Sequence, residues 1–343
     1  MKREMAINCV VARRRQLLWA LVALAVPASA VPGNAGRSGL AEADAALQAG
    51  RADAAMTILN GLPGPEANSA LAHNLRCRVL FVLEQWNDAA NECQQAVSLE
   101  PQVSMYHLWL GRGLGQKADV APFWQAYGLA KRARMEFEQA VALDPRNAEA
   151  LADLGEFYEE APGVVGGGTA KAQGVAERLD RIDAARAHEL RAGIAQENRD
   201  FDTAERELRA AVAASPHPAF QWMRLASFYR KYKKWPAMES AVESGRAAAG
   251  RDARAGVALF NGASVLIAAQ RNPALAIRML RDYLASPTQT EEGPTFVAHV
   301  WLARLEKQAG DSAAAGRERD AALAEASTYK PARDLNLQLD AHS

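Results

Sequence analysis

The sequence lacks the features that mark several classes of protein. Its formal net charge is zero over 343 residues, and no run of Lys or Arg alternates with aromatic residues, which argues against a nucleic-acid partner. It shows no HExxH zinc motif, no pair of catalytic carboxylates and no nucleophile that can be matched with a base. We therefore expect a non-enzymatic protein that binds no cofactor, metal or small-molecule ligand.

Cysteine is scarce, with three residues in the chain. Cys9 precedes the apolar segment near the N-terminus, so it cannot be the lipidated residue that follows a signal peptide. Cys77 and Cys93 fall in one predicted helical hairpin. Packed helices lie roughly 8–10 Å apart, whereas a disulfide needs Cα atoms within about 7 Å. The sequence leaves their pairing open and favours two small buried thiols.

Long apolar runs are also absent. The longest, residues 17–26, has about half of the roughly twenty residues that a membrane-crossing helix needs, so we expect no permanent membrane span. It follows three arginines at 13–15 and precedes the small residues 28–30, which is the order of a secretory signal peptide. We expect cleavage after Ala30 and a periplasmic or secreted protein. Without residues 1–30 the chain holds 35 basic and 39 acidic residues.

What the chain does have is alanine and helical periodicity. Apolar residues recur at helical spacing, without the alternating β-branched runs of strands. One pattern repeats: a small residue, a bulky one four later, a small one three later, then a proline. Its copies are Ala89, Cys93, Ala96 and Pro101; Ala133, Phe137, Ala140 and Pro145; and Ala204, Leu208, Ala211 and Pro216, with the small slot continuing at Ala55, Met238, Ala276 and Ala315.

A second pattern precedes the first in several copies. It reads Leu110, Gly111 and Leu114; Leu154, Gly155 and Tyr158; and Leu225, Ala226 and Tyr229. The glycine or alanine lets a paired helix lie close. Together the two patterns resemble the tetratricopeptide repeat (TPR) family, whose motif runs W-x2-L-G-x2-Y, then A-x3-F, then P. The resemblance covers residues 40–327.

The resemblance implies an all-α fold, a right-handed superhelical solenoid of antiparallel helix pairs. We expect seven full pairs after a short pair at 40–60, and each pair to bury its apolar face only against its neighbours. A terminal segment at 331–339 would cap the array. The expected regions are a signal peptide at 1–30, a flexible linker at 31–39, the repeat array at 40–327 and a C-terminal cap and tail at 328–343, with irregular insertions at 116–127 and 161–168.

Two motifs that could suggest chemistry have simpler interpretations. Four histidines occupy the slot of the motif's Trp in different repeats: His73, His107, His188 and His299. Repeats are separated by roughly 8–10 Å, far beyond zinc bonds of about 2 Å, so we predict packing with one polar edge satisfied. The glycine-rich run 163–168 leads into Thr169 and Ala170, where a phosphate loop needs Lys and then Ser or Thr. We predict an inter-helix loop with Thr169 as N-cap, and keep anion or peptide contact at the helix start as the alternative.

Function is expected on the inner surface, because TPR proteins generally bind extended or helical peptides along first-helix side chains. Transferred by spacing, the resemblance implies partner-binding roles for Asn74, Arg78, Phe81, Trp109, Arg112, Glu156, Glu160, Met223, Ser227, Arg230, Asn261, Arg304 and Lys307. Arginine with asparagine and an aromatic ring suits recognition of peptide backbone and carboxylates. The Lys and Asn set with which some relatives clamp a C-terminal carboxylate is not reproduced.

Three functions fit these observations. The first is a scaffold in the periplasm or cell envelope that binds a protein or peptide through the concave face of the array. The second is a peptidoglycan-active or other envelope enzyme, or its accessory, with a site in the insertions 116–127 and 161–168, where exposed aromatics would suit sugar stacking. The third is a subunit of an envelope-assembly machine whose partner is a folded protein. We favour the first, because the sequence combines the repeat with an export signal.

Overall fold

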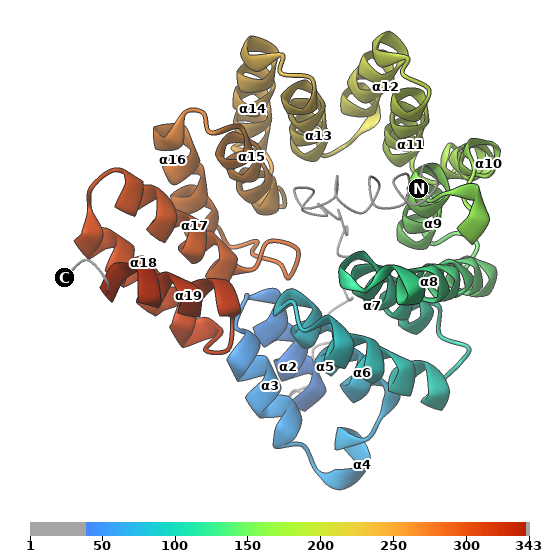
Figure 1. Cartoon of the computed structure of the whole chain (residues 1–343), viewed down its shortest axis with the longest axis horizontal. Coiled ribbons are helices and arrows are strands. Elements are labelled where there is room, and N and C mark those ends of the chain that lie inside the picture. The colour runs from blue at the N-terminus through green and yellow to red at the C-terminus, as the bar shows by residue number, and fades with distance from the viewer. Residues whose placement is uncertain (1–38, 341–343) are drawn as a thin grey trace. The chain divides into compact units, whose positions relative to one another are not determined.

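The structure, a computed structural model, describes residues 39–340, and in this part of the chain every regular element is a helix (Figure 1). None of the described helices combines the length and the apolar character needed to span a bilayer. The predicted signal peptide, most of the predicted linker and Cys9 lie outside the described residues.

The helices follow one another as pairs joined by short turns. The first helices are α2 (Gly39–Gln48), α5 (Ala70–Val82), α7 (Ser104–Val120), α9 (Ala148–Glu160), α11 (Ala184–Glu197), α13 (Pro218–Lys231), α15 (Gly256–Ala269) and α17 (Thr295–Gln308). The second helices are α3 (Ala52–Asn60), α6 (Trp86–Leu99), α8 (Phe123–Leu143), α10 (Thr169–Leu179), α12 (Phe201–Ala214), α14 (Trp235–Ala249), α16 (Pro273–Leu284) and α18 (Ser312–Glu325). The short helices α4 (Gly64–Ala67) and η1 (Gly163–Val165) lie in connections, and α19 (Lys330–Asp340) ends the described chain. The predicted TPR-like array, with its short first pair, seven full pairs and terminal helix, is confirmed.

The described chain packs into two compact units. Unit 1 holds residues 85–215, and unit 2 combines residues 39–84 with the residues after 215. Inside unit 2 the first pair meets the last, because α3 contacts α18 and the Ser327 N–H donates to Asp53 Oδ2 over 2.8 Å. This contact joins segments 274 residues apart. The expectation that each pair packs only against its chain neighbours is therefore wrong for the first and last pairs.

The repeated sequence slots form the core of each pair. Ala133, Phe137 and Ala140 expose only 1%, 5% and 0% of their surfaces, and the weaker copies of the small slot are equally buried. A Cβ atom at Gly111 would lie 2.6 Å from the Phe137 ring, which no real contact allows. Glycine at this position therefore sets how closely α8 approaches α7.

Three of the four slot histidines join the two helices of a pair. In each, Nδ1 hydrogen-bonds a glutamate of the second helix, at 2.6 to 2.7 Å: His107 to Glu136, His188 to Glu207 and His299 to Glu318. His107 also contacts the Pro101 carbonyl through Nε2 at 2.9 Å. These bonds confirm the predicted packing role, in which a polar edge is satisfied inside the pair.

The insertion at 116–127 lengthens two helices. Helix α7 runs on to Val120, α8 begins at Phe123, and only Ala121 and Pro122 separate them. The extra residues therefore project as a helical hairpin rather than as an irregular loop.

The glycine-rich run is a tight turn. The Gly168 N–H donates to the Tyr158 carbonyl over 2.7 Å, and the Gly167 N–H donates to the Pro162 carbonyl over 3.3 Å. Gly168 is the N-cap of α10, with φ of 153°, and Thr169 is the first helical residue. The predicted N-cap at Thr169 is therefore wrong, because the left-handed backbone that enters this helix suits glycine.

The two cysteines of the described chain, Cys77 and Cys93, are both fully buried and disulfide-bonded. The expectation of two free thiols is therefore wrong. The spacing of packed helices is a distance between helix axes, whereas the disulfide limit applies to Cα atoms, and each Cα lies about 2.3 Å off its axis. Facing Cα atoms can thus approach well within the limit for a disulfide.

Candidate partner interface

The first helices carry all thirteen residues that the sequence analysis assigned to partner binding. Those of unit 1 lie on α7 and α9, and those of unit 2 lie on α5, α13, α15 and α17. Their burial differs widely, from Asn74 with no exposed surface to the exposed Arg304. The surroundings of each side chain indicate which of them can meet a partner and which hold the array together.

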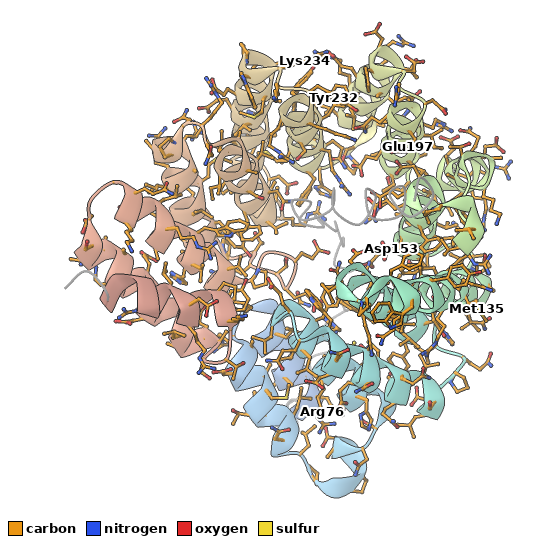
Figure 2. The ribbon with its side chains drawn as sticks, viewed as in Figure 1. Arg76, Met135, Asp153, Glu197, Tyr232 and Lys234 are labelled. Atoms are coloured by element: carbon orange, nitrogen blue, oxygen red, sulfur yellow. The ribbon has the colours of Figure 1, made fainter. Side chains whose placement is uncertain are left out.

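In unit 1, Arg112 of α7 is an internal ion-pair partner. Its Nε donates to Asp153 Oδ2 and its Nη2 donates to Glu149 Oε1, both over 2.6 Å. The guanidinium carbon also lies 4.8 Å from the centre of the Trp109 ring. Asp153 lies on the side of α9 that faces α7 (Figure 2). Both Arg112 and Trp109 are buried, so as found they join α7 to α9.

Burial governs the electrostatics of this cluster. Burial alone would lower the pKa of Arg112, but the adjacent Asp153 and Glu149 raise that pKa above its ordinary value. For Asp153 burial dominates and raises the pKa, against the opposing effect of Arg112. The second oxygen of Asp153, Oδ1, has no hydrogen-bond partner among the described residues. Asp153 therefore depends on Arg112 to remain ionised inside the fold.

The rest of α9 is acidic. The helix holds five carboxylates and no basic residue, and Glu149, Asp153, Glu156 and Glu160 follow one another at spacings of three and four residues. Such spacing places them along one helix face. On α11, a Cβ at Gly193 would lie 2.7 Å from the Glu159 carboxylate, so glycine makes room for that carboxylate. We call the five carboxylates of α9 together with Glu189 of α11 the acidic face; Glu156, Glu159, Glu160 and Glu189 are half-buried.

In unit 2, Arg78 of α5 is also engaged by carboxylates of the chain. Its Nη2 lies 2.6 Å from Glu291 Oε1 and 3.0 Å from Asp44 Oδ1. Burial alone would lower the pKa of Arg78, but Glu291 and Asp44 raise it overall. One turn earlier, Asn74 is fully buried, and neither atom of its amide has a hydrogen-bond partner among the described residues. This cluster joins α2, α5 and the loop before α17.

The other assigned residues of unit 2 range from core to surface. Met223 is buried, and its methyl group lies 2.6 Å from where a Cβ of Gly245 would be. Burial lowers the pKa of Arg230. The remaining members are half-buried or exposed: Phe81, Ser227, Asn261, Arg304 and Lys307. Their partner-binding roles stay predictions, and the accessible members suit them better than Asn74 and Met223.

A basic cluster at the end of α13 packs on aromatic rings. Lys234 Nζ lies 5.8 Å from the centre of the Phe228 ring, and Lys231 Nζ lies 5.7 Å from that of Tyr232. The centres of the Phe228 and Tyr232 rings are themselves 4.9 Å apart. No pattern in the sequence predicts this cation–π packing, because the packing joins residues on both sides of a helix end.

Residues that matter here were missed for two different reasons. Glu149 and Asp153 share the four-residue spacing of the acidic face, which is visible in the sequence. Glu291 lies in a loop 213 residues from Arg78, and no local pattern connects them. Only the packing of the first pair against the last brings Glu291 to α5.

Comparisons with known proteins concern the fold. No family model and no curated protein matches the sequence. A thermophilic TPR protein from Thermus thermophilus is 20% identical at a TM-score of 0.43, covering 52% of this chain and 91% of that one. The Cut9–Hcn1 hetero-tetramer of the APC/C is 17% identical at 0.45, covering 78% of this chain and 48% of that one. The C-terminal part of a TPR repeat-containing protein from Cytophaga hutchinsonii is 14% identical at 0.40, covering 74% of this chain and 97% of that one.

Proposed function

We propose that the chain is a non-enzymatic scaffold of the cell envelope, and that unit 1 binds a protein segment rich in Lys and Arg along its acidic face. The proposal rests on the composition of α9, a first helix that holds five carboxylates and no basic residue. Arg112 of α7 pairs with Glu149 and Asp153. Helix α9 itself supplies only acidic charges, and a cationic segment would complement such a surface.

The acidic face lies on a helix that is held in place by contacts with its neighbour α7. Arg112 is held by two carboxylates and by the Trp109 ring, which fixes α9 against α7. A rigid base lowers the conformational entropy that binding costs, so affinity can be shared over several moderate ion pairs. Charged pairs at such a surface act mainly on the association rate and are weakened by salt.

The envelope location rests on two observations. The sequence begins with a basic segment, a short apolar run and small residues in signal-peptide order. Cys77 and Cys93 are disulfide-bonded, and disulfides form and persist in oxidising compartments such as the bacterial periplasm. Fractionation of cells that express the tagged chain tests this part; recovery in the cytosol with residues 1–30 intact would contradict it.

Peptide binding tests the acidic face. Fluorescence anisotropy with a labelled Lys- and Arg-rich peptide compares the wild type with Glu156→Gln, Glu160→Gln. The matched control is Glu177→Gln, Asp202→Asn, two exposed carboxylates on the second helices of unit 1. We expect the first variant to weaken binding by about twofold to thirtyfold at low salt, since two charged contacts are each worth roughly 0.2–1 kcal/mol. Equal affinities for variant and control would exclude this face.

A further inference from the structure

The hairpin of α7 and α8 ends in an apolar tip. Val120, Phe123, Trp124 and Tyr127 expose 66%, 49%, 76% and 44% of their surfaces. We call these four residues the aromatic tip. Tryptophan is rarely exposed to this degree, and contiguous exposed apolar residues mark interaction sites.

The described part of the chain covers little of this tip. The first buried residue of α8 is Ala133, so the ten residues 123–132 contain none, and burial on α7 ends at Ala118. The tip therefore lies at the end of the α7–α8 hairpin, beyond the last buried residue of α7 and before the first of α8.

The charges around the tip are mostly positive. Asp119 directly precedes Val120, but residues 120–135 include no acidic side chain, and Lys117, Lys131, Arg132 and Arg134 lie on the same two helices. Lys131 Nζ lies 5.6 Å from the centre of the Tyr127 ring, and Arg132 donates to an uncharged partner, Gln94 Oε1, over 2.8 Å. The apolar tip is thus bordered by net positive charge.

This combination favours an anionic lipid surface over a protein. From the usual burial of large side chains, the tip offers on the order of 500 Å², below the roughly 800 Å² that each partner buries in a stable protein interface. Trp and Tyr prefer the membrane–water interface, and each Lys or Arg close to anionic lipid adds attraction. We propose that the aromatic tip docks this protein peripherally on a membrane that contains anionic lipid.

Vesicle sedimentation tests the proposal, with phosphatidylcholine vesicles that contain or lack phosphatidylglycerol. The variants are Phe123→Ser, Trp124→Ala for the apolar contact and Lys131→Gln, Arg132→Gln for the charge. The matched control is Leu71→Ser, an apolar residue of unit 2 that is 41% exposed. Every full-length variant contains the apolar run at 17–26. The same series of variants is therefore also tested in a chain that starts at residue 31. Circular dichroism establishes that each variant is folded.

We expect the wild type and the Leu71→Ser control to sediment with phosphatidylglycerol vesicles. Phe123→Ser, Trp124→Ala should lower the partition coefficient by at least about tenfold, since burial of one aromatic side chain exceeds that factor. Lys131→Gln, Arg132→Gln should lower it on anionic vesicles alone. Equal partitioning of all variants would overturn the proposal. The proposal would also be overturned if the tip variants kept their vesicle binding but changed either the sedimentation mass of the chain or its binding to peptidoglycan. The tip would then contact a second copy of the chain or a glycan.

Discussion

Replacing Arg112 by Met should destabilise unit 1 through the carboxylate left behind. Asp153 exposes 1% of its surface, its Oδ2 is bonded to Arg112 and its Oδ1 has no partner among the described residues. Removing one member of a buried ion pair typically costs about 3–5 kcal/mol, because the other charge stays buried without compensation. A pair of apolar residues of similar volume is often neutral. Arg112→Met, Asp153→Leu should therefore recover most of the loss.

Hydrogen exchange of the α7 and α9 amides measures this effect locally. A repeat array opens in parts, so a single unfolding midpoint would mix unit 1 with unit 2. The free energy of opening should fall by about 3–5 kcal/mol in Arg112→Met and by much less in the double variant. The deficit of Arg112→Met should shrink as pH falls, because a protonated Asp153 needs no cation. A loss below about 1 kcal/mol, or a double variant no better than the single one, would refute the assignment of Arg112 as the partner of a buried charge.

Three further predictions use other parts of the chain. Gly111→Ala should destabilise the α7–α8 pair by about 1–3 kcal/mol, because the added Cβ would clash with the Phe137 ring. Gly115→Ala, whose Cβ would meet open space, should be neutral or stabilising, and equal effects on hydrogen exchange of the α7 and α8 amides would contradict this. The hydrogen bond that His107 donates to the Glu136 carboxylate raises the pKa of His107. The stability that this bond contributes is complete below the ordinary histidine pKa of about 6.5 and is lost as pH rises through the raised pKa. The stability difference between the wild type and His107→Gln should therefore shrink with rising pH, and a constant difference would contradict this. Neither Cys77 nor Cys93 should be alkylated before reduction, and mass spectrometry that finds both alkylated without reductant would contradict the disulfide-bonded state.

The repeat could be predicted because its determinants are local. Ala133, Phe137 and Ala140 share one helix face, and a proline follows two residues after the end of α8. Each such signal lies within a single helix and its next turn, so spacing alone reveals it. The short first pair, the seven full pairs and the terminal helix follow from these signals.

Packing between distant segments could not be predicted in this way. Arg78 meets Glu291 across 213 residues, and α3 meets α18, because the chain returns on itself inside unit 2. Asn74 and Met223, placed on the binding face by spacing, are fully or almost fully buried, and Met223 packs against Gly245 of α14 and Gly262 of α15. Spacing gives the face of a helix, while the neighbouring elements decide whether that face reaches solvent.

The most direct test of the account places a photocrosslinking amino acid at Glu156 on the acidic face and, separately, at Glu177 on the second helix α10, in cells that produce the chain. We expect an envelope protein to be crosslinked at Glu156 and none at Glu177. The crosslink at Glu156 should map to a segment rich in Lys and Arg. Crosslinks at Glu177 alone, or at Glu156 to a segment without basic residues, would contradict binding along the first helices of unit 1.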